Sequence, residues 1–335
     1  MKSRYFAAAA AVTTFAAVAL SPAVSLACAC GCGIFDVGAD SMAPSDSPSG
    51  VTVWLRYDFM DQNQNFEGVN KAPASDNDDK KLQTDFYTLG GDYRVNHDWT
   101  LMAVLPVVAR AFTTTDDGTV FGPAGSRYTA HDNAIGDLEL SALYTGFSED
   151  MSTGLSFGVK LPTGDSRGPI GPLGGAEIDR DSLPGSGSTD LLVGGYHAGA
   201  LNASGKLAYF VQARYQFAIA TERGYRPGSE LDAAVGVSYN VGQVGVLTKV
   251  APVLSLLESD RVHDTGPAAD PLNSGYDRTL IAPGIDLRIN KVQLYADVEL
   301  PIYQHMNAAP SLAIEGTSGQ LVASALWKLQ MSYDF

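Results

Sequence analysis

The last sixteen residues of the chain, Gln320–Phe335, alternate between apolar and polar side chains from end to end. One face is apolar throughout, and the opposite face carries the ionisable side chains Lys328 and Asp334. Successive side chains of a β-strand point to opposite faces of a sheet, so this period of two predicts a strand. Strands of soluble proteins are usually about five or six residues long, whereas a long strand with one wet and one apolar face is typical of a membrane-spanning β-barrel. The alternative for this segment alone is an amphipathic strand of a soluble β-sandwich.

Eleven further alternating runs precede this segment, and the connections between runs are alternately long and short. Short turns include Asn96-His97-Asp98, Gly242-Gln243 and Asn290-Lys291. Outer-membrane barrels have this asymmetry, with short periplasmic turns and longer outer loops. The runs cover residues 51–60, 84–95, 99–111, 135–145, 153–161, 189–200, 206–218, 231–241, 244–256, 278–289 and 292–303.

The pattern predicts an all-β fold, a transmembrane antiparallel up-and-down β-barrel of about 12 strands over residues 50–335. We expect the first and last strands to pair, because lipid does not tolerate an open sheet edge. The interpretation places the protein in the outer membrane of a Gram-negative bacterium, as a porin-like transport protein.

Residues 1–27 have the pattern of a secretory signal peptide. Lys2 and Arg4 precede an apolar stretch that is too short for a spanning helix, and Ser25-Leu26-Ala27 predicts cleavage after Ala27. No later segment has eighteen consecutive apolar residues, so no transmembrane helix is expected.

The charge of the chain argues against nucleic acid and anionic lipid as partners. Without Lys2 and Arg4, the chain carries 20 basic and 37 acidic residues, a formal charge of −17. The expected partners are the lipid bilayer, a small-molecule solute and the barrel-assembly machinery. The aromatic residues Trp327, Tyr333 and Phe335 near the C-terminus resemble the signal that this machinery reads.

Residues 28–49 form a predicted periplasmic segment that contains all three cysteines, Cys28, Cys30 and Cys32. An odd number of cysteines cannot pair completely, and the i, i+2 spacing permits only a strained local disulfide. Three alternatives remain: a site for a soft metal such as copper(I) or zinc, a lipid on Cys28, or a redox-active or disulfide-paired tether. Apart from such a metal, no cofactor is expected.

Charged residues at the polar positions of the strands are the candidates for the lumen. They pair across strands and fill a narrow interior, or they line a polar pathway with charge-based selectivity. A barrel of about eight strands is filled by side chains and one of about sixteen leaves a channel, so about twelve lies between. The candidates are Arg56, Asp58, Asp92, Arg94, Asp137, Glu139, Lys160, Arg214, Asp232, Asp286, Arg288, Asp297, Glu299, Lys328 and Asp334.

Enzyme chemistry is the weaker alternative. The predicted outer loops contain Asp116-Asp117, His131-Asp132 and His263-Asp264, which are residue types that activate water. No motif places a serine nucleophile against a histidine, so we predict that the protein is not an enzyme. The acidic group Asp76, Asp78 and Asp79 does not have the spacing of an EF-hand calcium loop.

Three short motifs carry a family resemblance: Ile135-Gly136-Asp137-Leu138-Glu139, Lys160-Leu161-Pro162-Thr163-Gly164-Asp165 and Gly187-Ser188-Thr189-Asp190-Leu191. The region that contains them resembles outer-membrane barrels of the phenol-degradation MetA-pathway type. This resemblance implies transport of hydrophobic or aromatic compounds. The predicted function is therefore an outer-membrane channel or transporter for a small hydrophobic or aromatic solute. The alternative is a membrane-anchored binding protein whose cysteine segment holds a soft metal or docks a periplasmic redox partner.

Overall fold

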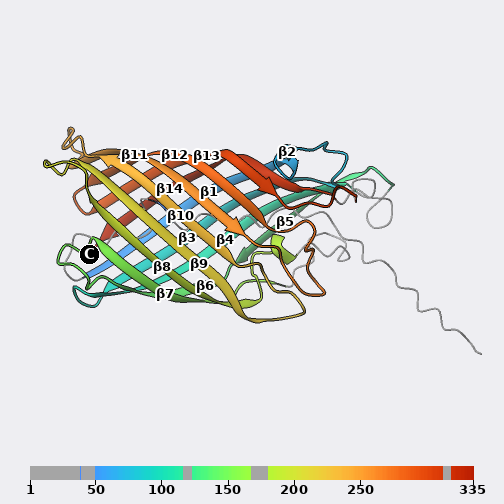
Figure 1. The fold of residues 1–335 in the computed structure, drawn as a ribbon, viewed down its shortest axis with the longest axis horizontal. Helices are drawn as coiled ribbons and strands as arrows, with labels where there is room; N and C mark the ends of the chain where they lie inside the picture. Colours follow the sequence, from blue (N-terminus) through green and yellow to red (C-terminus); the bar gives the residue numbers. More distant parts are fainter. Residues whose placement is uncertain (1–37, 39–49, 116–122, 167–179, 312–317) are drawn as a thin grey trace, which may run out of the picture.

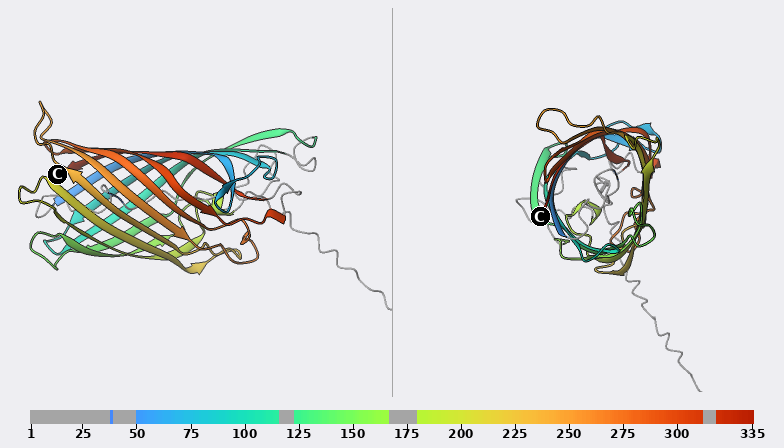
Figure 2. Two further views of the ribbon diagram at one scale, coloured as in Figure 1. Left: turned by 45° about the horizontal axis from the view of Figure 1, so that its top comes forward. Right: turned by 90° about the vertical axis from the view of Figure 1, so that its left-hand side faces the viewer.

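The chain forms one closed antiparallel β-barrel, seen from the side in Figure 1 and along its axis in the right-hand view of Figure 2. The computed structural model describes residue 38 and residues 50–115, 123–166, 180–311 and 318–335. The elements are β1 (Gly50–Glu67), β2 (Asn70–Lys71), β3 (Asp79–Arg94), β4 (Trp99–Thr115), β5 (Arg127–Ile135), β6 (Leu138–Tyr144), β7 (Thr153–Leu161), the 3-10 helix η1 (Arg180–Ser182), β8 (Ser188–Ala200), β9 (Leu207–Thr221), β10 (Glu230–Tyr239), β11 (Lys249–Arg261), β12 (Tyr276–Ile289), β13 (Val292–Met306) and β14 (Gln320–Asp334).

Twelve strand positions make up the wall, because two elements share one position and one lies outside it. Strand β4 pairs with β5 as far as Val107↔Ile135 and then with β6 from Val104↔Glu139, so β5 and β6 form one strand interrupted at 136–137. The short β2 pairs only with β1. Strand β14 pairs with β1 and closes the ring. The predicted up-and-down barrel is confirmed.

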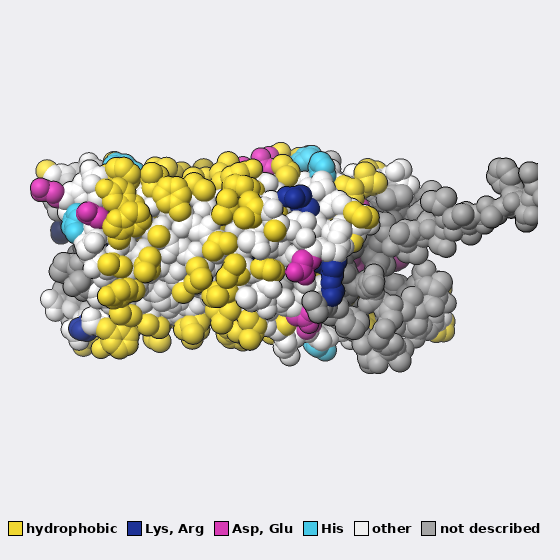
Figure 3. All heavy atoms as spheres, turned by 90° about the horizontal axis from the view of Figure 1, so that it is seen from below, with side chains coloured by type: hydrophobic (Ala, Val, Ile, Leu, Met, Phe, Trp, Pro, Cys, Tyr) yellow, Lys and Arg dark blue, Asp and Glu magenta, His cyan; other side chains and the backbone are white. Residues whose placement is uncertain are grey.

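The wall carries apolar side chains outward and polar side chains inward. On β14, Trp327 is 56% exposed whereas Lys328 is 4% exposed. Figure 3 shows apolar side chains over most of the visible wall, with charged side chains and histidines toward its ends. A closed barrel with an apolar outer band is the form that bacterial outer-membrane proteins take. The protein is therefore a barrel of the bacterial outer membrane.

Within the described part of the chain, no helix has the length and apolar character needed to cross a membrane.

The barrel is taller than its apolar band on the side of the long loops. Along the outer face of β11, Leu254 and Leu256 are followed by Glu258 and Asp260. Strands β1, β3 and β4 also extend further toward this side than expected, and β5 lies in what was predicted as a loop. The outward side chains of β5 include His131 instead of an unbroken apolar series. The apolar–polar alternation that predicts a strand is therefore missing in this part of the wall.

The predicted turn between the eighth and ninth strands is wrong. Strand β11 begins at Lys249, not Val244, and residues 240–248 connect it to β10. Gly242 and Gly245 have φ of 101° and 59°, a backbone conformation that favours glycine and ends the strand. Val244 and Leu247 form a small isolated bridge within this connection.

An apolar core fills part of the barrel interior. It contains Met60, Leu257, Leu280, Met306 and Leu326, which come from β1 and from the strands β11 to β14. Each of these side chains is at most 5% exposed. The interior space that remains open is described below.

Candidate functional site

The predicted lumen residues lie on the inner face of the wall. Of the fifteen candidates, eleven line one of two interior cavities: Arg56, Asp92, Arg94, Asp137, Glu139, Lys160, Arg214, Asp232, Asp286, Arg288 and Asp334. The other four are Asp58, Asp297, Glu299 and Lys328, and all are buried.

Those four buried residues are packed into the wall where β1, β13 and β14 meet. Lys328 is the cross-strand partner of both Asp58 and Asp297, and its Nζ lies 3.1 Å from Glu299 Oε1. The Tyr295 hydroxyl donates to Asp297 Oδ2 at 2.7 Å. This part of the lumen is therefore filled by paired charges.

The inner cavity has a volume of about 600 Å³ and lies toward the short turns. Its lining includes the aromatic side chains of Trp54, Tyr196, Phe210 and Tyr295. Two of the rings lie flat on the wall over a glycine, because a Cβ at Gly90 would overlap the Trp54 indole and one at Gly236 would overlap the Phe210 ring. Their faces are consequently available to the cavity.

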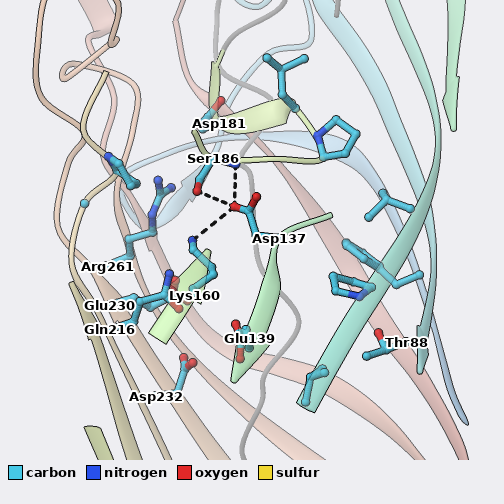
Figure 4. Close-up of a pocket in the computed structure, with 18 of the residues that line it drawn as sticks. Thr88, Asp137, Glu139, Lys160, Asp181, Ser186, Gln216, Glu230, Asp232 and Arg261 are labelled. Carbon is cyan, nitrogen blue, oxygen red and sulfur yellow. Dashed lines mark hydrogen bonds and ion pairs between the residues drawn. The ribbon is translucent and has the colours of Figure 1, made fainter. Parts of the chain in front are cut away.

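The outer cavity has a volume of about 210 Å³ and is lined by charged side chains on one side and apolar side chains on the other (Figure 4). Its basic lining residues are Arg56, Arg110, Lys160, Arg180, Arg214 and Arg261, against five acidic ones. Two guanidinium groups stack on rings: Arg110 lies 5.9 Å from the Phe86 centroid, and Arg180 lies 5.1 Å from the Tyr225 centroid.

The segment that carries η1 is fastened to the inside of the wall by Asp137. Asp137 Oδ1 accepts from the Gly164 N–H at 3.0 Å, and Oδ2 accepts from the N–H and the hydroxyl of Ser186 at 2.9 and 2.6 Å. Lys160 reaches Asp190 at 2.7 Å and Asp137 at 3.9 Å (Figure 4 shows the second contact). The three motifs behind the family resemblance therefore meet at one junction, where β5 gives way to β6.

Four residues line both cavities and therefore lie between them, and we call this group the neck: Arg56, Val104, Glu139 and Arg214. Arg214 Nη1 donates to Glu139 Oε2 at 3.0 Å, although β7 and β8 separate their strands. Arg56 belongs to β1, which lies six wall positions from the β9 strand of Arg214 and hence on the opposite side of the ring. The two guanidinium groups of the neck therefore come from opposite sides of the wall.

Gly38 lies inside the barrel. Its N–H donates to Gln212 Oε1 at 3.0 Å, and the residue lines the inner cavity. The predicted signal peptide 1–27 and the cysteines Cys28, Cys30 and Cys32 lie outside the described residues. Within the described ranges, no group of three or more His, Cys, Asp or Glu side chains is placed to hold a metal ion.

The described residues that were considered for enzyme chemistry lie on β5 or in an outer loop. His131 is exposed on β5, and Asp116-Asp117 lie outside the described residues. Asp264 is buried and accepts from the Tyr225 hydroxyl at 2.8 Å and the Gly228 N–H at 2.7 Å, so it joins two outer loops. Asp79 is also buried, and this burial raises its pKa to about 8.

The aromatic residues near the C-terminus are on the outer surface, Trp327 at the middle of β14 and Tyr333 and Phe335 beside the short turns. Trp327, Tyr333 and Phe335 are all exposed, and the rings of the last two are 4.8 Å apart. The Phe335 N–H donates to the carbonyl of Val51 at 2.9 Å, so the end of the chain joins the seam between β1 and β14.

Several lining residues were not among the candidates predicted from the sequence. Arg110, Arg180 and Arg261 join the outer cavity, and the rings of Trp54 and Phe210 face the inner one. The two rings could have been found by their position in the alternation. Trp54 shares the inward face of Arg56, and Phe210 shares that of Arg214.

Comparison with known proteins identifies the fold. No protein-family profile matches the sequence, and no curated protein matches it. Among solved structures, an outer-membrane channel from Pseudomonas putida F1 has a TM-score of 0.60 and 14% identity, covering 88% of this chain and 100% of that one. The β domain of the Bordetella autotransporter BrkA has a TM-score of 0.49 and 13% identity, covering 85% and 100%. The P. putida toluene transporter TodX has a TM-score of 0.42 and 10% identity, covering 88% and 91%. The chain thus shares its barrel fold with an outer-membrane channel.

Proposed function

We propose that this protein is an outer-membrane channel or transporter that passes a small hydrophobic or aromatic solute. The observation that carries the proposal is a pair of interior cavities that share the neck residues inside a closed barrel. An apolar cavity of about 150 Å³ is large enough to hold benzene. The inner cavity, at about 600 Å³ and with aromatic rings in its lining, has room for a monoaromatic solute.

Two further findings support the proposal. The solved structure with a TM-score of 0.60 is named as an outer-membrane channel. The three motifs that resemble the phenol-degradation MetA-pathway type converge on the wall of the outer cavity, where Asp137 and Lys160 lie. We infer a transport role rather than an enzymatic one, because the convergent polar groups face a passage. The bilayer surrounds the apolar band, and the exposed rings of Trp327, Tyr333 and Phe335 fit recognition by the barrel-assembly machinery.

Planar-bilayer recordings of the full-length protein test the channel. Replacement of Val104 at the neck by tryptophan should reduce the ionic current and the flux of an aromatic solute, because the larger ring occupies the passage. Val107→Trp is the matched control, since Val107 is on the same strand but is 41% exposed on the outer face. Absence of any current and any flux, or equal current in both variants, would contradict the proposal.

A further inference from the structure

On opposite walls of the barrel, a guanidinium group of the neck and an aromatic ring of the inner cavity follow the same order along their strands. Strands β1 and β9 both run from the side of the short turns toward the side of the long loops. On β1, Trp54 precedes Arg56 on the inward face, and Arg56 lies 5.8 Å from the Trp54 ring centroid. On β9, Phe210 precedes Arg214 on the inward face. On both walls, a solute that enters from outside meets a guanidinium first and a ring next.

Each guanidinium already holds a carboxylate of the protein, but the two pairs differ in burial. Arg56 Nε contacts Asp58 Oδ2 at 3.0 Å, and their side chains are 4% and 5% exposed. The side chains of Arg214 and Glu139 are each 15% exposed, and both line the two cavities. The Arg214–Glu139 pair is therefore the more accessible of the two.

A guanidinium presents its donors in a planar fork that matches a carboxylate, so a solute carboxylate can replace Glu139 on Arg214. A Glu139 carboxylate displaced from Arg214 would still have a cation beside it, because Lys160 is its cross-strand partner on β7. The lining of the outer cavity has six basic and five acidic residues, although the chain as a whole carries a formal charge of −15. The approach to the neck is thus more favourable to an anion than the rest of the molecule.

We propose that the neck recognises an aromatic carboxylic acid in its ionised form. Its carboxylate binds Arg214 in place of Glu139, and its ring enters the inner cavity against Trp54 and Phe210. This inference rests on the proposed function, since it names the class of solute that the same passage takes. Glu139 acts as an internal competitor that holds Arg214 until the solute arrives.

Equilibrium binding of radiolabelled benzoate to the full-length protein in detergent at neutral pH tests the inference. Benzyl alcohol, with a similar ring and no charge, and acetate, with the charge and no ring, should both bind more weakly than benzoate. Arg214→Gln should weaken benzoate binding at least about tenfold, as expected for loss of hydrogen bonds to a charged group. Glu139→Gln should strengthen it, because the competitor loses its charge.

Lys291→Gln serves as the control, since it removes one positive charge from an exposed turn outside the lumen and should leave benzoate binding unchanged. Arg214→Lys keeps the charge without the fork and should bind benzoate less tightly than the wild type. Heat-modifiable gel migration identifies variants whose barrel has assembled, and only these are compared.

Equal binding of benzoate and benzyl alcohol, or weaker benzoate binding in Glu139→Gln, would overturn the inference. If benzoate fails to bind while current or aromatic flux still passes the lumen, the inference alone is lost. If binding, current and flux are all absent, the proposed function is lost with it.

Discussion

Ser186 donates two hydrogen bonds to Asp137 Oδ2, from its N–H at 2.9 Å and from its hydroxyl at 2.6 Å. Asp137 stands at the interruption between β5 and β6, and Ser186 belongs to the segment that follows η1. A break in the wall is thereby tied to a loop that lies inside the barrel. The size of the outer cavity depends on this contact, because Ser186 and its neighbours Leu183 and Pro184 line it.

Asp137→Ala should release the η1 segment from the wall. We expect a loss of about 1–3 kcal/mol in the free energy of unfolding, because buried donors lose a charged acceptor, and a larger single-channel current. Urea unfolding from lipid vesicles and bilayer recordings measure the two effects. Asp260→Ala, on the exposed face of β11, is the control. Identical stability and current in the two variants would contradict the role of Asp137.

Gly90→Ala should disturb the Trp54 ring in the inner cavity. The new Cβ would overlap the indole, and such overpacking costs about 1–3 kcal/mol of unfolding free energy. Gly91→Ala on the same strand is the matched control, because its Cβ would have only the Thr52 carbonyl oxygen nearby, at 3.9 Å. Denaturant midpoints and the fluorescence of the tryptophans distinguish the two. Equal effects would show that the ring does not lie over Gly90.

Loss of one partner of the Lys328–Glu299 pair should be more damaging than loss of both. The two side chains are 2% and 1% exposed, so Lys328→Met leaves an uncompensated buried carboxylate and should cost about 3–5 kcal/mol. The double change Lys328→Met with Glu299→Leu should recover most of this loss. Unfolding midpoints of the wild type, both single variants and the double variant complete the comparison. Additive losses would mean that the pair is not coupled.

The stability of the barrel should depend on pH through Asp79, which lies at the outer end of β3. This residue lies beyond the apolar band, near Asp78, Lys80, Thr114 and Asp181, and burial raises its pKa from 3.8 to about 8. Between these values the folded protein holds a proton that the unfolded chain lacks, so the free energy of unfolding should fall as the pH rises from about 4 to about 8.

Asp79→Asn should remove this part of the pH dependence and stabilise the barrel most at the alkaline end of the window. Asp260→Asn, which changes an exposed carboxylate on β11, should leave the slope close to that of the wild type. Unfolding curves collected across the pH range give the slopes. An Asp79→Asn slope equal to the wild-type slope would rule out Asp79 as the titrating group.

Deletion of Phe335 should reduce the amount of barrel inserted in the outer membrane more than it reduces transport per molecule. The residue is 68% exposed, its ring packs edge-to-face against Tyr333, and its N–H donates to the closing seam. Surface labelling of intact cells gives the inserted amount, and uptake divided by that amount gives the activity. Normal surface levels of the shortened chain would count against an assembly role.

The sequence predicted the wall well because lipid and lumen impose opposite requirements on alternate residues. The alternation that places Trp327 on the apolar face and Lys328 on the polar face of β14 also predicted which charged residues of the other strands face the lumen. The prediction failed at β5 and at the start of β11. His131 of β5 faces water instead of lipid, and Val244 and Val246 are apolar without belonging to a strand.

The alternation in the sequence does not reveal which side chains contact one another inside the lumen. Arg214 and Glu139 are 75 residues apart and meet over two intervening strands, which depends on the register of every strand between them. The inward position of η1 depends on the interruption at Asp137, which alternation does not reveal. The charged residues themselves could be named, but not which of them pair and which surround a passage.

Uptake of a radiolabelled monoaromatic hydrocarbon by cells with a lipopolysaccharide outer membrane tests the central claim most directly. Such a membrane slows the passage of apolar solutes, so a protein pathway becomes visible. The structure predicts faster uptake in cells that carry the protein than in cells without it, with the gain lost in Val104→Trp and kept in Val107→Trp at equal surface levels. Uptake that is unchanged by the protein, or a gain that survives in Val104→Trp, would contradict a solute pathway through the neck.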